Sequence, residues 1–195
     1  MSSLLDGIGV ARDSDRRVNQ SFDRVMKQYP SLSGLGLSAR TGQGGGYAEF
    51  YPSDEGRSPN PGIPTIEVRD KGLSGSDAEL DATIFGDALH QMPLSNPDFR
   101  AAKSEFMASM GPFEHRVLQS MYAQAIGEGD QRSYEDFVDQ SGADAFIRDY
   151  MFQEHGTIPG GRPFVDGWPN RDGAYMPALE KMRNMVFGQA GLLSK

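Results

Sequence analysis

Residues 65–93, TIEVRDKGLSGSDAELDATIFGDALHQMP, contain the change of pattern that decides the fold. The segment opens with β-branched residues that alternate with charged ones, and this alternation predicts a short strand over 65–70. Ser76 and Glu79 then have the spacing of a capping box, which predicts that a helix begins there. The helix is expected to run to about Met92, because a proline follows. The sequence therefore predicts a strand and, shortly after it, a capped helix.

The predicted helix has an apolar side and a polar side. At about 100° per residue, the apolar side holds six residues that form the expected core face: Leu80, Ile84, Phe85, Ala88, Leu89 and Met92. Thr83, Gly86 and His90 lie on the opposite side, and Asp87 lies at the boundary between the two. Asp87 and His90 are three residues apart, so their side chains are neighbours on one surface of the helix.

The Asp87–His90 pair has three interpretations. Such a pair is half of a metal site, an acid–base pair, or a hydrogen-bonded pair on a solvated face. A zincin-type metallopeptidase has two histidines at i and i+4, with a glutamate directly after the first. Here Gly86 stands at the first histidine position and offers no ligand, and Asp87 is one methylene shorter than glutamate. The orientation of this face fits a zincin helix, whereas its ligand set does not.

The composition is that of a globular protein and excludes several classes of function. The 195 residues suffice for one domain with a core. A net charge of −8 argues against binding to a nucleic-acid backbone, which requires cationic side chains. The absence of cysteine excludes disulfides, iron–sulfur clusters and thiolate zinc sites. No stretch has the pattern of a signal peptide or a membrane span, so a protein in solution or in a soluble assembly is expected.

The sequence predicts three parts. Residues 1–29 form an N-terminal amphipathic helix or arm, which docks on its own domain or on a neighbouring subunit. Residues 30–175 form a single α+β domain with a Gly/Pro-rich lead-in, in which a strand over 47–51 precedes the strand described above. Residues 176–195 form a C-terminal helix. Because two or three short strands precede a cluster of four to five helices, the expected fold is α+β and mainly helical.

Several motifs resemble known families. The strand and the capped helix with IFGDALH (84–90) are similar to the strand-and-helix core of small zincin-like domains. Together with AEFYPSDEGRSPNPGIP (48–64) and FIRDYMF (146–152), they resemble uncharacterised virion-associated proteins of tailed bacteriophages and prophages, often of the short-tailed type. The resemblance implies a zincin-like layout without established catalytic residues. The zincin motif matches only Asp87 and His90, and a third ligand would come from one of three acidic residues: Glu135, Asp139 or Asp144.

Two apolar segments near the C-terminus are candidate interfaces. Met182, Met185 and Phe187 belong to an apolar stripe on the C-terminal helix, which contacts another subunit or packs within the domain. Aromatic and arginine side chains often anchor protein–protein interfaces. The loop RPFVDGWPNRDG offers three such residues, which contact a partner or pack within the chain: Arg162, Phe164 and Trp168.

The first functional hypothesis is a non-catalytic structural or accessory protein of a tailed-bacteriophage virion. It acts through protein–protein interfaces in the tail or at the head-to-tail connector, next to other virion proteins of the tail or portal. It forms a homo-oligomer or associates with a ring, requires no cofactor or metal, and binds neither nucleic acid nor membrane. It is expected in the virion and, during assembly, in the host bacterial cytoplasm.

The alternative hypothesis is an enzyme. It is a metal-dependent hydrolase, a zincin-like peptidase with a rearranged ligand set that includes His90 and with Asp87 as the second catalytic residue. The missing ligand at Gly86 favours the structural role. A third hypothesis, an injected factor whose acidic surface mimics nucleic acid, has little support from a net charge of −8.

Overall fold

The computed structural model describes most of the chain. Residues 3–42, 47–127, 129–155 and 173–187 are described, with the backbone alone for 3–15, 141 and 151–155. Among the helices in these ranges, none is long and apolar enough to cross a membrane.

The chain divides into two compact units with a boundary between Gln91 and Met92. The described part of unit 1 is residues 3–42 and 47–91, and that of unit 2 begins at Met92. The expected division into an arm (1–29), a single domain (30–175) and a C-terminal helix (176–195) stays a prediction. The N-terminal helix belongs to unit 1 and the C-terminal helix to unit 2, because each buries apolar side chains there.

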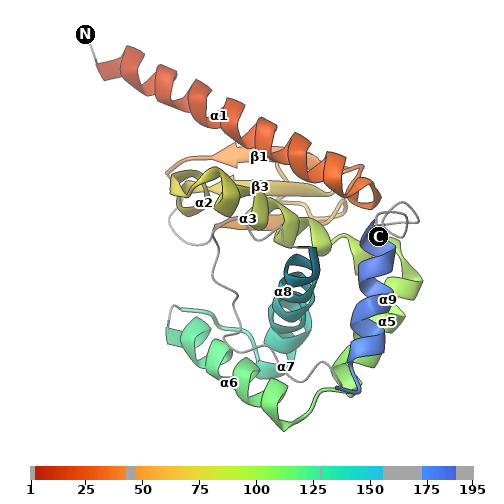
Figure 1. Cartoon of the computed structure of the whole chain (residues 1–195). Coiled ribbons are helices and arrows are strands. Elements are labelled where there is room, and N and C mark those ends of the chain that lie inside the picture. The colour runs from red at the N-terminus through yellow and green to blue at the C-terminus, as the bar shows by residue number, and fades with distance from the viewer. Residues whose placement is uncertain (1–2, 43–46, 128, 156–172, 188–195) are drawn as a thin grey trace. The chain divides into compact units, whose positions relative to one another are not determined.

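Unit 1 contains a three-stranded sheet in the order β1-β3-β2 (Figure 1). The strands are β1 (Gly36–Arg40), β2 (Ala48–Tyr51) and β3 (Thr65–Arg69). The central strand, β3, is parallel to β1 and antiparallel to β2. Its central position explains why β3 is buried from Thr65 to Val68, whereas most of the two edge strands is half-buried. Both predicted strands are confirmed, and β1 is the third.

Four helical segments complete the described part of unit 1. They are α1 (Ser3–Gln28), the 3-10 turn η1 (Pro30–Leu32), α2 (Asp70–Ser74) and α3 (Asp77–Leu89). The side of α3 that was predicted to face the core is buried at all of its positions: Leu80, Ile84, Phe85, Ala88 and Leu89. Val18, Val25 and Tyr29 add to this core from α1 and the residue that follows it.

The capping box at the start of α3 is confirmed, but the helix ends earlier than predicted. The Ser76 hydroxyl accepts from the Glu79 N–H, and the Glu79 carboxylate accepts from the Ser76 N–H at 2.6 Å. The helix ends at Leu89, and Met92 begins a separate turn, α4 (Met92–Ser95). Pro93 does not end the first helix, because proline fits the first turn of a new one.

Unit 2 is helical. Its segments are α4, α5 (Pro97–Ala108), α6 (Pro112–Gly127), α7 (Tyr134–Phe137), the π turn η2 (Val138–Gly142), α8 (Ala143–His155) and α9 (Met176–Phe187). Aromatic contacts join the core: the ring of Phe106 on α5 lies 6.1 Å from that of Phe146 on α8 and 6.0 Å from that of Tyr175. The N-terminus of α5 is capped by Asn96, which accepts from two backbone N–H groups.

The segments α7, η2 and α8 follow one another along the chain, with the π turn η2 between the two α-helices. A Cβ atom at Gly142 would lie 2.5 Å from Cδ2 of Leu118 on α6. A side chain at position 142 would therefore require the Leu118 side chain on α6 to move. With a small sheet in unit 1 and helices elsewhere, the predicted α+β, mainly helical fold class is confirmed.

Candidate functional site

Asp87 and His90 lie where the end of α3 meets β2. His90 is the C-cap residue, and its N–H donates to the Asp87 carbonyl at 3.1 Å. Its imidazole stacks on the ring of Phe50 from β2, with centroids 6.0 Å apart and an interplanar angle of 28°. Both Asp87 and His90 are half-buried. The side of α3 that was predicted to lie opposite the core is therefore partly covered, and one face of the imidazole contacts an aromatic ring.

The predicted third ligands do not form a metal site with this pair in the described part of the chain. There, no three His, Cys, Asp or Glu side chains are placed to hold a metal ion. Glu135 and Asp139 are exposed on unit 2. Asp144 is buried, and its Oδ1 lies 2.8 Å from Nζ of Lys103, so a cation already matches its charge.

The polar face of the sheet carries an ionisable cluster that the sequence alone did not reveal. Alternation places Glu49 and Tyr51 of β2 on the same face as Glu67 and Arg69 of β3, and the register sets Glu49 directly opposite Glu67. Arg69 forms ion pairs with both carboxylates, at 3.7 Å from Nε to Oε1 of Glu67. The Tyr51 hydroxyl donates to Oε2 of Glu49 at 2.9 Å and lies 3.4 Å from Oε1 of Glu67.

Two residues of this cluster are buried in the sheet. Glu67 is 2% exposed and Tyr51 6%. Burial raises the pKa of the Tyr51 hydroxyl, and the negative charge of Glu67 raises it further. Because like charges directly opposite one another repel, Arg69 is needed to hold the two carboxylates side by side. The alternating charges in the predicted strands were the available signal, but only the register shows which residues meet.

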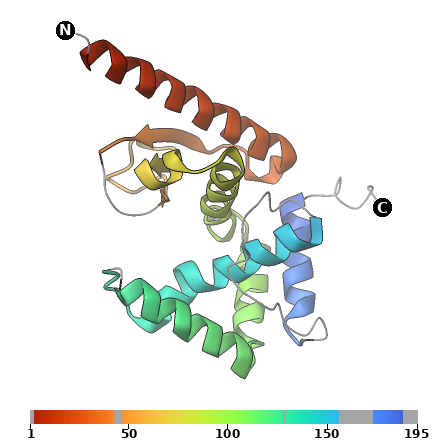
Figure 2. The same cartoon turned by 60° about the vertical axis from the view of Figure 1, so that its left-hand side comes forward.

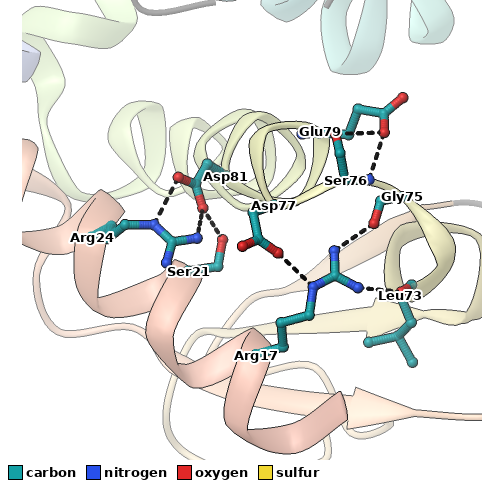
Figure 3. Close-up of polar contacts among 9 residues, drawn as sticks. All are labelled: Arg17, Ser21, Arg24, Leu73, Gly75, Ser76, Asp77, Glu79 and Asp81. Atoms are coloured by element: carbon teal, nitrogen blue, oxygen red, sulfur yellow. Dashed lines mark hydrogen bonds and ion pairs between the residues drawn. The ribbon is translucent and has the colours of Figure 1, made fainter. Parts of the chain in front are cut away.

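A third group of polar contacts joins α1 to α2 and α3 (Figure 3). Nε of Arg17 lies 2.6 Å from Oδ1 of Asp77, in the first turn of α3. The same guanidinium donates to the carbonyl of Leu73 at 3.0 Å and to that of Gly75, which together form the C-terminal end of α2. Arg17 therefore supplies donors to carbonyls that a helix end leaves unpaired.

One helical turn farther along, Asp81 continues these contacts. It accepts from the Ser21 hydroxyl and, through both oxygens, from the Arg24 guanidinium at 2.8 and 3.0 Å (Figure 3). The hydrogen bonds that Arg24 donates to Asp81 raise the pKa of Arg24, and the hydrogen bond that Arg17 donates to Asp77 lowers the pKa of the Asp77 carboxyl. Both ion pairs are open to water, so they contribute little free energy and mainly fix the register of the two helices.

Apolar burial supplies most of the free energy that holds α1 on unit 1. Val18 is 1% exposed, Val25 3% and Tyr29 2%, and the Tyr29 ring lies 4.4 Å from that of Phe85 on α3. Burial of side chains of this size contributes about 1.5–3 kcal/mol each, as an upper estimate. The C-terminal half of α1 is thus a fixed part of unit 1 and not a loosely attached arm.

The candidate interface residues differ in how far the structure describes and buries them. Met182 is fully buried on α9 within unit 2. Its part in an interface between subunits stays a prediction. Met185 and Phe187 are half-buried on the same helix. Three candidates lie outside the described residues: Arg162, Phe164 and Trp168.

Comparisons with known proteins give no relative. No protein-family model matches the chain, no curated protein matches it, and no solved structure matches it. The resemblance to virion-associated phage proteins and the zincin-like layout therefore stay predictions.

Proposed function

We propose that this protein is a non-catalytic structural or accessory component of a tailed-bacteriophage virion, acting through protein–protein interfaces in the tail or head-to-tail region. The observation that carries the proposal is α1, a helix of 26 residues. Its C-terminal half is packed on unit 1, and its N-terminal half extends beyond the other elements of that unit (Figures 1 and 2). Such a helix presents its N-terminal half to a neighbouring protein.

The sequence of residues 3–16 supports a contact role for this half of α1. It amounts to about 21 Å of helix at 1.5 Å per residue. Gly7 and Gly9 each make a helix less stable than alanine would, by about 1 kcal/mol. Because most helical stability in proteins comes from packing of an apolar face, a partner surface would supply the stabilisation that these residues lack.

The virion as the place of action is supported by the motifs over 48–70, 84–90 and 146–152, which resemble virion-associated phage proteins. On this proposal the partners are other virion proteins of the tail or portal, and the chain is a homo-oligomer or is bound to a ring. It is present in the host cytoplasm only until it is assembled into the particle.

Mass spectrometry of purified particles tests the proposal. Virions of a phage that encodes this chain are purified on a density gradient and washed with high salt, which removes weakly adsorbed protein. The chain is expected among the proteins that remain. Its absence, when the known capsid and tail proteins of the same particles are detected, would contradict the proposal.

A further inference from the structure

We draw no further inference here: the strongest candidate, the side-chain cluster of Glu49, Tyr51, Glu67 and Arg69 on the polar face of the sheet in unit 1, already pairs its two carboxylates with Arg69 and the Tyr51 hydroxyl, and nothing in the described part of the chain indicates which ligand it would bind.

Discussion

Replacing Asp144 by alanine is expected to destabilise unit 2 by about 3–5 kcal/mol. The ion pair between Lys103 on α5 and Asp144 on α8 is short, at 2.8 Å, and each side chain is 9% exposed. The replacement leaves the Lys103 ammonium in a poorly solvated place without this carboxylate. The double variant K103M/D144L removes both charged groups, so its stability is expected to equal that of the parent or to exceed it by about 1–4 kcal/mol.

Urea unfolding followed by far-ultraviolet circular dichroism measures these free energies. Glu105→Ala is the matched control, because its partner Lys181 also joins α5 to another helix, but both side chains are about half exposed. This control is expected to lose less than about 1 kcal/mol. If Asp144→Ala loses no more than the control, or if the double variant is as unstable as the single one, the pair does not stabilise unit 2 in this way. Either result would leave Asp144 as a possible metal ligand.

Three further outcomes follow from the structure. Gly142→Ala is expected to destabilise the protein by about 1–3 kcal/mol, because its Cβ would meet Leu118 at 2.5 Å. Adding Leu118→Ala to this variant should recover part of the free energy of unfolding measured in urea, and no recovery would point to another cause. Burial, together with the charge of Glu114 and a hydrogen bond to it, raises the pKa of Tyr175 to about 12. Because the pKa is raised on folding, the stability contributed by the protonated Tyr175 hydroxyl is complete below about pH 10 and is lost as the pH rises towards 12. The free energy of unfolding should therefore differ less between pH 8 and pH 11 in Tyr175→Phe than in the parent, and an equal difference would contradict this cause. Zinc and a chelator should leave the melting temperature of the parent and of His90→Ala equally unchanged, whereas a zinc-dependent rise that His90→Ala abolishes would favour the hydrolase.

The parts of the fold that depend on neighbouring residues in the chain were predictable. The capping box of Ser76 and Glu79 forms within one turn, and the apolar side of α3 follows from helical spacing. α1 lies within the N-terminal segment for which an amphipathic helix was predicted from helical spacing. The end of α3 was predicted at about Met92 and lies at Leu89, because a proline that can end one helix can also begin another.

The parts that depend on contacts between distant segments were not predictable. Both strands that carry Glu49 and Glu67 were identified, yet only their register shows that the two carboxylates face each other. The apolar stripe with Met182 is equally compatible with a core and with an interface, because both bury the same kind of side chain. The structure shows that Met182 is in the core. Asp87 lies on α3 and His90 is its C-cap residue, and only the fold shows that His90 stacks on Phe50 of β2.

The number of copies of this chain in a purified virion tests the proposed function most directly. Absolute quantification with labelled peptides, relative to the portal and major capsid proteins, gives this number for salt-washed particles. The proposal predicts a fixed copy number that matches the symmetry of a tail or portal ring and is the same in independent preparations. Particles that are complete and infectious but contain no copies of the chain would contradict it.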